Sequence, residues 1–404
     1  MIKGKEFGVK RMMQWGILGL FLLLSLFSAS KSWAVGNIHL GLMEVHPGFQ
    51  VKQAHYQLIN EDDPDSGGDW VTTYSPGIKM EWPIRQHTIK ADWLFGFNRY
   101  HKNKDQNYTG ENLSTNGNFV FGQGGRQITL NLGHTQIVTD EAGYIGESRR
   151  KRRENRLTSK LGVNFNNNLR LDFSYGLDTY RYDNRDGEKY DVDNMNLNQF
   201  ETAINVRVQP KTEAFISGRY YQYNYQYDYN GINGDSSSWT VGPGIRWDAT
   251  AKLSGQISGG FSWKNYKNGE NISTWVVAVD LTHHTSDFTK ISLGLDKGDR
   301  DHSLSGSTNF DNYAFNQVRL SFDHQLTYKI KFLSGFTYEY DKYRGVDRKD
   351  NIYAWRLGLN YQIQEWLVTN LGFEQRHRDC NGDKRYRETD YDDNIFSLSL
   401  GLAL

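Results

Sequence analysis

The 404-residue chain is poor in cysteine and proline and carries no excess charge of either sign. Its one cysteine, Cys380, excludes an internal disulfide framework and any metal cluster built on cysteines. Lysine plus arginine and aspartate plus glutamate balance at 47 each, so no overall field would steer nucleic acid or acidic ligands to the chain. Six prolines, 40 glycines and 14% aromatic residues form a mixture that is unusual for a helical protein.

Long apolar runs are missing except near the N-terminus. The segment Lys3–Arg11 contains several cations, Ile17–Phe27 is apolar, and Ser32-Trp33-Ala34 offers small residues at a cleavage site. This pattern predicts a secretory signal peptide over residues 1–34, cut near Ala34, followed by a single domain over residues 35–404. The alternative, an uncleaved membrane anchor, needs about 18 or more apolar residues. Secretion also argues against a nucleic-acid partner.

The end of the chain shows the pattern that dominates the rest. Phe396, Leu398, Leu400, Leu402 and Leu404 alternate with Ser397, Ser399, Gly401 and Ala403. This period of two indicates a β-strand with one apolar face. A soluble protein would bury that face in a two-layer core, whereas a membrane barrel turns it to lipid. Similar segments of ten residues or more recur without a linker. We count about eighteen, with sixteen as the alternative, a range typical of pore-forming barrels.

The connections between these segments alternate in length, which favours the membrane barrel. The predicted short turns are Pro83–Gln86, Gly122–Gly125, Asn166–Asn168, Gln209–Lys211, Asp248–Thr250, His283–Ser286 and Gln362–Gln364. The predicted long loops are Asn60–Asp69, Tyr100–Glu111, Thr139–Arg153, Asp183–Asp193, Asp228–Ser237, Lys264–Asn271, Gly298–Asp311, Asp341–Asn351 and Asp379–Asp393. The sequence therefore predicts an all-β, transmembrane, antiparallel up-and-down β-barrel with short periplasmic turns and long extracellular loops.

Four segments carry a family resemblance. His46–Gln50, Gly68–Met80, Thr88–Arg99 and Tyr391–Leu400 resemble the putative beta-barrel porin family of outer-membrane proteins, often associated with exopolysaccharide export clusters. The resemblance implies a barrel in the outer membrane of a Gram-negative bacterium that lets a polysaccharide or a small solute cross. Its expected partners are outer-membrane lipid, lipopolysaccharide, the barrel-assembly machinery and periplasmic polysaccharide-export components. One departure is the final Leu404, where many outer-membrane proteins end in Phe or Trp.

The residues opposite the apolar face are the candidates for the lining of a pore. They are Lys90, Asp92, Arg156, Lys160, Arg170, Asp172, Asp178, Glu201, Arg207, Arg246, Asp280, Asp296, Arg319, Asp323, Arg356 and Glu374. One interpretation is that opposed charges pair across neighbouring strands and rigidify the wall. The other is a constriction of mixed charge that orders water and a polar solute. The absence of a basic excess points to a neutral or weakly charged cargo.

A tyrosine-rich segment is the candidate for a saccharide path. Tyr221, Tyr223, Tyr225, Tyr227 and Tyr229 share the parity of the lumen face. Sugar rings stack on aromatic faces, so such a row could guide a saccharide. The alternative is a strand extension held together by neighbouring aromatic residues. A bulge in the strand would reverse the parity.

Two kinds of charged loop suggest further ligands. The run Arg149, Arg150, Lys151, Arg152 and Arg153 is a candidate contact for lipopolysaccharide phosphates, or else an ordinary solvated loop. Aspartate-rich stretches such as Asp390, Asp392 and Asp393 could hold Ca²⁺, although none has the spacing of a dedicated calcium loop.

No enzyme motif is present, and we predict no catalytic residue, metal or cofactor. His283 and His284 fall in a predicted turn. A hydrolase without a local motif would need Asn131, His134 and Ser174 to converge in space. The preferred function is a porin-like channel for saccharide-like solutes, including exopolysaccharide export. The alternatives are an outer-membrane enzyme acting on lipid or lipopolysaccharide, and a closed structural or adhesion barrel.

Overall fold

The computed structural model describes residues 38–57, 67–123, 126–141, 150–183, 194–228, 233–248, 252–301, 312–344, 347–382 and 390–403. The predicted signal peptide and cleavage site lie outside these residues. Within them, one short 3-10 helix, η1 (Lys104–Gln106), accompanies a set of β-strands. No helix of the described ranges is long and apolar enough to cross a membrane.

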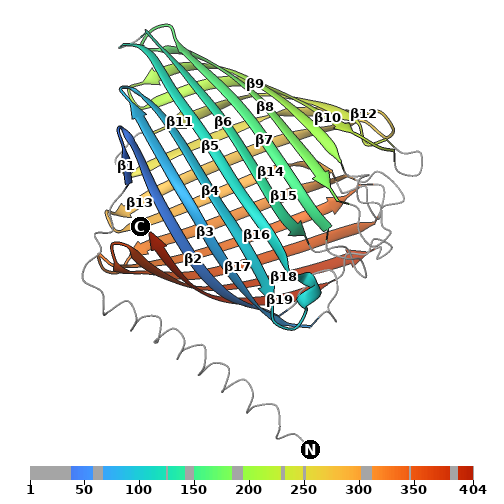
Figure 1. Cartoon of the computed structure of the whole chain (residues 1–404). Helices are drawn as coiled ribbons and strands as arrows, with labels where there is room; N and C mark the ends of the chain where they lie inside the picture. The colour runs from blue at the N-terminus through green and yellow to red at the C-terminus, as the bar shows by residue number, and fades with distance from the viewer. Residues whose placement is uncertain are drawn as a thin grey trace, which may run out of the picture. The chain divides into compact units, whose positions relative to one another are not determined.

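The strands follow one another along the chain as hairpins. Their bounds are β1 (Ile38–Leu40), β2 (Met43–Tyr56), β3 (Asp69–Ile84), β4 (His87–Tyr100), β5 (Tyr108–Gln123), β6 (Arg126–Glu141), β7 (Arg150–Asn164), β8 (Leu169–Tyr182), β9 (Met195–Gln209), β10 (Thr212–Tyr225), β11 (Ser236–Trp247), β12 (Leu253–Tyr266), β13 (Ile272–Ser286), β14 (Thr289–Asp301), β15 (Asn312–Gln325), β16 (Ile330–Tyr343), β17 (Arg348–Gln364), β18 (Leu367–Gly382) and β19 (Tyr391–Ala403). Figure 1 shows them as one tilted, antiparallel wall.

The sheet closes because its last strand pairs with its first long strand. β19 runs antiparallel to β2, with Leu402 opposite Phe49 and Leu398 opposite Gln53. Closure leaves no open sheet edge, which a membrane-spanning sheet requires because lipid offers no hydrogen bonds. The eighteen strands β2–β19 form the barrel, and the three-residue β1 adds to β2. The predicted transmembrane barrel of about 18 strands is therefore confirmed.

Short turns gather at one end of the barrel and longer loops at the other, as predicted, but several boundaries were wrong. His283 and His284 lie within β13, and the turn follows at 287–288; Gln362–Gln364 lies within β17, and its turn is 365–366. Both pairs of strands have a register irregularity at these residues, between His284 and Ser286 and between Gln362 and Gln364. Polar residues at such an irregularity resemble a turn in sequence although the pairing continues.

The strands also extend farther into the predicted extracellular loops than expected. β6 runs to Glu141 and β7 begins at Arg150, inside the predicted loop Thr139–Arg153. β16, β17, β18 and β19 extend in the same way into Asp341–Asn351 and Asp379–Asp393. Above the membrane a strand no longer needs an apolar outer face, so the alternation ends while the hydrogen-bonded pairing continues.

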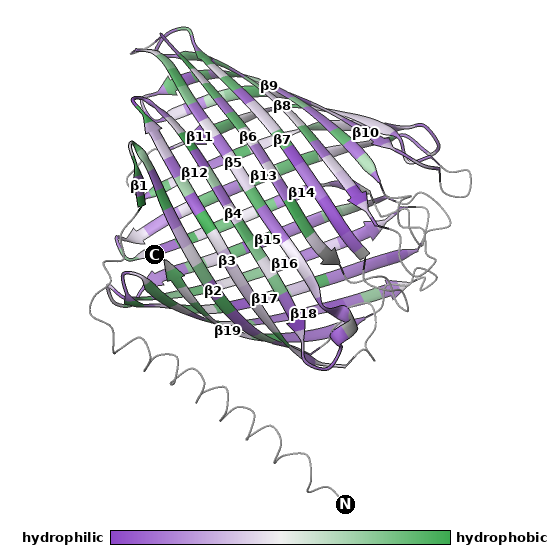
Figure 2. Ribbon diagram, viewed as in Figure 1, coloured by the Kyte–Doolittle hydropathy of each residue, from purple (hydrophilic) through white to green (hydrophobic). Residues whose placement is uncertain are grey.

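The two faces of the wall differ in chemistry, as the alternating bands of hydropathy along the strands in Figure 2 show. One face exposes large apolar side chains, among them Trp275 at 66%, Ile216 at 61% and Phe396 at 53%. The largest fully buried side chains of the described residues are all polar: Asn205, Asp69, Asp178, Asp350 and Asp393. Apolar outside and polar inside is the reverse of a soluble protein and is the arrangement of a membrane barrel.

Candidate pore lining and its charged clusters

The predicted lining residues share the face opposite the exposed apolar side chains. Following the strand register around the barrel, all sixteen alternate with residues such as Leu157, Leu320 and Trp355. Some of them reach over an intervening strand: Arg170 on β8 meets Glu213 on β10 at 3.2 Å, and Arg319 on β15 lies 3.6 Å from Asp280 on β13. Alternate strands lie about 9.5 Å apart. Side chains that meet across that distance indicate the concave, inner side of a barrel.

Most of these charges pair with an opposite charge nearby. The distances from guanidinium nitrogen to carboxylate oxygen are 2.9 Å for Arg156–Asp178, 3.1 Å for Arg170–Asp172 and 3.1 Å for Arg219–Glu201. Arg356 contacts Glu374 at 2.9 Å, and Arg319 also bonds Asp296. This arrangement favours the first interpretation, that opposed charges pair between strands and hold the wall rigid.

Two lining residues stand apart from this pairing. Lys160 and Asp92 are exposed and form no ion pair with any residue that the structure describes. Lys160 lies between Asn131 on β6 and Ser174 on β8 in the strand register. Both residues remain available to a solute on the inner face.

Three predicted lining arginines converge on one carboxylate that sequence reasoning missed. Besides Arg170, the guanidinium groups of Arg207 and Arg246 each lie 3.8 Å from Glu213. The four side chains come from β8, β9, β10 and β11, at the ends nearest the short turns. Glu213 follows a register shift at Thr212. No local signal marks it, because its importance comes entirely from its neighbours on other strands.

A cavity of about 620 Å³ opens beside this arginine cluster. Arg207, Glu213, Arg246, Gln256 and Asp280 are among its lining residues. Arg246 donates to Gln256 at 2.9 Å, and its guanidinium lies 5.3 Å from the centre of the Phe215 ring. The cavity lining carries three cations, Arg207, Lys211 and Arg246, and three carboxylates, Glu213, Asp248 and Asp280. The short-turn mouth is therefore a polar surface of balanced charge.

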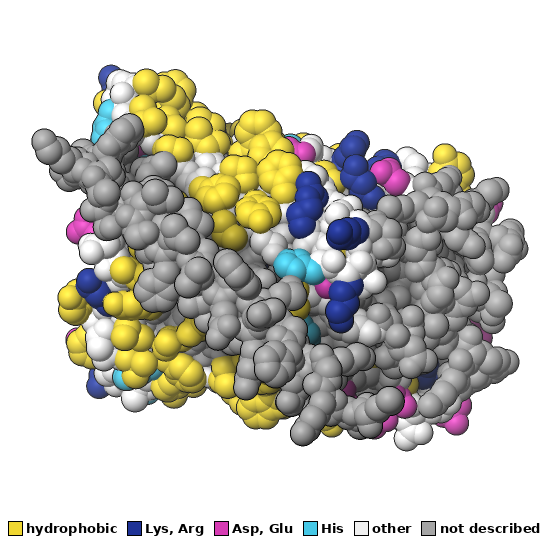
Figure 3. All heavy atoms as spheres, turned by 60° about the horizontal axis from the view of Figure 1, so that its bottom comes forward, with side chains coloured by type: hydrophobic (Ala, Val, Ile, Leu, Met, Phe, Trp, Pro, Cys, Tyr) yellow, Lys and Arg dark blue, Asp and Glu magenta, His cyan; other side chains and the backbone are white. Residues whose placement is uncertain are grey.

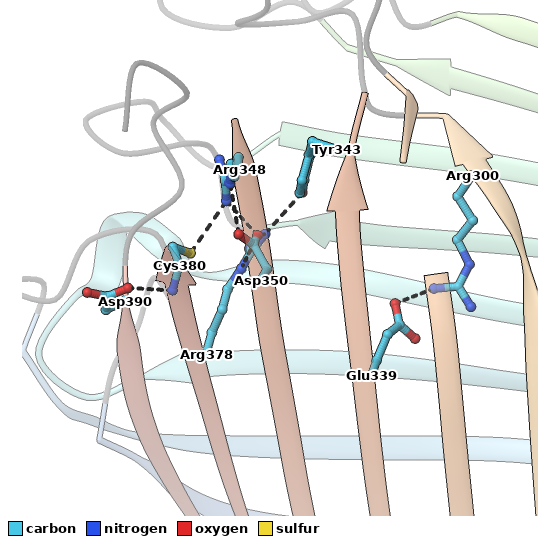
Figure 4. A network of polar contacts seen from close by, with 8 residues as sticks. All are labelled: Arg300, Glu339, Tyr343, Arg348, Asp350, Arg378, Cys380 and Asp390. Atoms are coloured by element: carbon cyan, nitrogen blue, oxygen red, sulfur yellow. Dashed lines mark hydrogen bonds and ion pairs between the residues drawn. The ribbon is translucent and has the colours of Figure 1, made fainter. Parts of the chain in front are cut away.

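A second network lies on β16–β18 near the extracellular end, and all of its members except Arg378 are in segments that were predicted to be loops (Figure 4). Arg348 holds Asp350 through two bonds of 2.9 and 2.6 Å, and Arg378 adds a bond of 2.7 Å. Arg348 also lies 3.4 Å from the sulfur of Cys380. The side chains of Arg348 and Asp350 are 1% and 0% exposed. Arg348 and Asp350 are thus desolvated, Arg378 is 12% exposed, and the network joins β17 to β18. A contact of 3.5 Å from Arg378 to the Tyr343 hydroxyl extends it to β16.

Directly opposite Asp350 in the register lies a second buried carboxylate, Asp341, which is 2% exposed. One of its oxygens, Oδ1, has no hydrogen-bond partner. Like charges opposite one another in a sheet destabilise it. Asp350 is thus compensated by two arginines, whereas Asp341 is not compensated to the same degree.

The tyrosine row is shorter than predicted. Tyr221, Tyr223 and Tyr225 lie on the inner face of β10, and the Lys264 amine sits 4.2 Å from the centre of the Tyr223 ring. Tyr227 follows the end of the strand in a bend and is 49% exposed. It therefore does not continue the row, since parity holds only while the chain stays extended. Tyr229 lies outside the described residues.

The basic run predicted to lie in a loop is largely part of a strand. Arg150 to Arg153 belong to β7, so their side chains alternate between faces. Lys151 and Arg153 are exposed on the outer face, whereas Arg152 points inward and lies 3.7 Å from Glu154. Arg149 and the side chain of Arg150 lie outside the described residues.

The remaining candidates do not assemble into a site. Asn131 and Ser174 lie on the inner face, but His134 lies opposite Leu157 on the outer face, so the three do not converge. Asp390 accepts from the Cys380 amide at 2.6 Å, Asp392 from His377 at 2.7 Å, and Asp393 from the Gln57 amide at 3.1 Å. Among the described residues no group of three or more His, Cys, Asp or Glu side chains could hold a metal ion.

Comparison with solved structures finds matches over most of the chain at low sequence identity. OpdO from Pseudomonas aeruginosa is 14% identical, with 89% of this chain and 97% of that chain covered and a TM-score of 0.49. OccAB4 from Acinetobacter baumannii is 11% identical, with 92% and 100% covered and a TM-score of 0.47. OccK2 (OpdF) from Pseudomonas aeruginosa is 11% identical, with 90% and 98% covered and a TM-score of 0.49.

No curated protein matches the chain in sequence. A family model, Putative beta-barrel porin 2, matches residues 34–404. That range includes every strand of the barrel. The chain therefore belongs to the Putative beta-barrel porin 2 family, and it is a porin-like β-barrel of the outer membrane.

Proposed function

We propose that the barrel is a channel for saccharide-like solutes, including exopolysaccharide leaving the cell, and that it works without catalysing a reaction. The observation that carries the proposal is the inner face of β10, where Tyr221, Tyr223 and Tyr225 follow one another at every second residue. Gln199 and Ser238 lie opposite Tyr221, Ser236 lies opposite Tyr223, and the Arg219–Glu201 ion pair is the next inward position along the strand. Such a surface offers hydrogen bonds to hydroxyl groups and ring faces to sugar C–H groups.

The charges of the wall favour a neutral or weakly charged solute. Most carboxylates and guanidinium groups already pair with one another, and the cavity beside Glu213 carries equal numbers of cations and carboxylates. A strongly acidic polymer would therefore meet little excess positive charge. Lys264 over Tyr223 would have to move aside, or bond a sugar hydroxyl, when a saccharide stacks on that ring. Delivery from the periplasm would require export components there, and insertion would require the barrel-assembly machinery.

The test is single-channel conductance of the refolded mature chain in a planar bilayer, with and without added oligosaccharide. We expect a steady conductance that oligosaccharide blocks, and weaker block in Y221A/Y223A/Y225A. Losing stacking of about 1 kcal/mol at one ring would raise the blocking concentration about fivefold. The control is F200A/Y220A, which removes two rings from the outer face of β9 and β10.

Each outcome separates the proposal from its alternatives. Equal block in the inner and outer variants would contradict a saccharide path along these tyrosines. A barrel that conducts nothing would contradict an open channel and would favour a structural or adhesion role. The enzyme alternative has no support from geometry, since His134 is on the opposite face from Asn131 and Ser174.

A further inference from the structure

We propose that the outer wall of the barrel binds the phosphate groups of lipopolysaccharide through two cross-strand pairs of cations, Arg153 with Arg181 and Lys342 with Lys349. The first pair joins β7 to β8 and the second joins β16 to β17. Both pairs lie on the surface that faces the membrane. Their binding of phosphate is independent of what passes through the lumen.

The strand register places like charges directly opposite each other in both pairs. Arg153, Lys342 and Lys349 are exposed, and Arg181 is partly exposed. All four alternate with inward-facing residues such as Arg152 and Arg348. Facing like charges destabilise a sheet. An anion bound between two cations would relieve that repulsion. The arrangement is therefore best explained by an anionic ligand at the outer surface.

Cations on the inner face of the same strands, by contrast, form ion pairs with carboxylates. Arg152 lies 3.7 Å from Glu154, and Arg348 lies 2.6 Å from Asp350. None of the four outward cations has an ion pair with a carboxylate that the structure describes. Arg181 donates only to neutral oxygens: the carbonyls of Tyr180 at 2.7 Å and Met195 at 2.9 Å, and the Asn196 amide at 2.6 Å.

Other charged groups nearby leave the balance positive at the arginine pair and neutral at the lysine pair. Lys151 is exposed on the same face as Arg153, two residues farther up β7. The exposed Asp183 donates its backbone N–H to the Lys151 carbonyl at 3.0 Å, but its carboxylate forms no ion pair among the described residues. Near the lysine pair, the exposed Asp347 and Asp379 form no described ion pair, and their two carboxylates offset the two lysine charges. Glu154 and Asp341 point inward and are buried.

The height of the pairs on the wall identifies the kind of anion. Arg181 and Lys342 each lie twelve residues beyond the start of their strands at the short-turn end. At about 3.3 Å per residue and a tilt near 40°, that is roughly 30 Å, just above an apolar band of about 25 Å. Below them the same face carries apolar residues such as Phe173, which is 46% exposed.

Figure 3 shows the same order on one side of the wall, where a hydrophobic surface is bordered by Lys and Arg side chains. In the outer leaflet of the outer membrane, the anionic groups at this level are the phosphates of lipopolysaccharide. Guanidinium groups bind phosphate through paired, charge-assisted hydrogen bonds. The three bonds that Arg181 makes to β8 and β9 hold its guanidinium in place, so little side-chain freedom is lost on binding.

The experiment measures lipopolysaccharide bound to the refolded, lipid-free mature barrel in detergent, by native mass spectrometry during a titration. The probes are lipopolysaccharide, the same material after removal of its phosphates, and inorganic phosphate. The test variants are R153Q/R181Q and K342Q/K349Q. The control is R152Q/K160Q, which removes two charges from the inner face of β7.

We expect R153Q/R181Q to bind lipopolysaccharide about tenfold more weakly than the wild type, because charge-assisted hydrogen bonds are about twice as strong as neutral ones. A smaller loss is expected for K342Q/K349Q, because lysine does not bind phosphate bidentately. The control and the wild type should bind equally. Equal binding by R153Q/R181Q, or undiminished binding of the dephosphorylated probe, would overturn the proposal. Competition by millimolar inorganic phosphate would indicate a free-phosphate site instead of a lipid contact.

Discussion

At the scale of the residue, two aspartates at one register position differ sharply in their surroundings. Asp350 forms ion pairs with both Arg348 and Arg378, whereas Asp341 opposite it keeps an oxygen without a hydrogen bond. We expect Asp350→Asn to destabilise the barrel by about 3–5 kcal/mol, because it leaves a buried guanidinium uncompensated. Asp341→Asn should be neutral or stabilising, because it removes repulsion between facing carboxylates. Unfolding in urea from lipid vesicles measures both.

The two substitutions serve as each other's control, since they change the same atoms at neighbouring positions. Equal losses of stability in the two variants would contradict the prediction that Asp350, and not Asp341, compensates the buried arginines. The same network contains Cys380, the one cysteine of the chain, so labelling of its thiol in the Asp350→Asn variant reports local opening.

At the scale of the strand, the alternation of faces predicts opposite effects for adjacent residues. Leu320 on β15 is 44% exposed on the outer face, and Ser321 beside it faces inward, opposite Ser292 and Gly335. Leu320→Arg should cost about 2–4 kcal/mol, because it places a charge against lipid. Ser321→Arg should cost much less, because the wet interior and two small neighbours accommodate the side chain. Urea unfolding of the two variants in the same vesicles measures both stabilities. Equal losses of stability would contradict the assignment of Leu320 to the outer face and Ser321 to the inner face.

At the scale of the whole molecule, the decisive contact is between the two ends of the sheet. Gln53 on β2 lies opposite Leu398 on β19, so Q53C/L398C should form a disulfide on mild oxidation. The control is Q53C/L371C, because Leu371 lies one strand farther away, opposite Leu398, at about 9.5 Å from β2. Electrophoresis without reductant distinguishes the two. Cross-linking of the control, or of neither pair, would mean that the sheet closes in another register.

Several properties of the barrel follow from the sequence because they are local. The period-two alternation in segments such as 394–404, and the sorting of short and long connections, were enough to predict a membrane barrel and about 18 strands. The inward parity of Arg156 and Glu374 was equally readable, since each side chain's face depends only on its own strand. The strand ends were less predictable, because the loss of alternation above the membrane does not end the pairing.

Only the tertiary structure decided which charges meet. Glu213 collects Arg170, Arg207 and Arg246, Asp341 faces Asp350, and Arg153 faces Arg181. Each of these contacts depends on the register between strands, which turn lengths, bulges and the closure of the barrel set together. A shift of one residue would separate every such pair while leaving each strand's own pattern unchanged. The sequence by itself thus determined the barrel and its two faces, and the register of the closed sheet determined its sites.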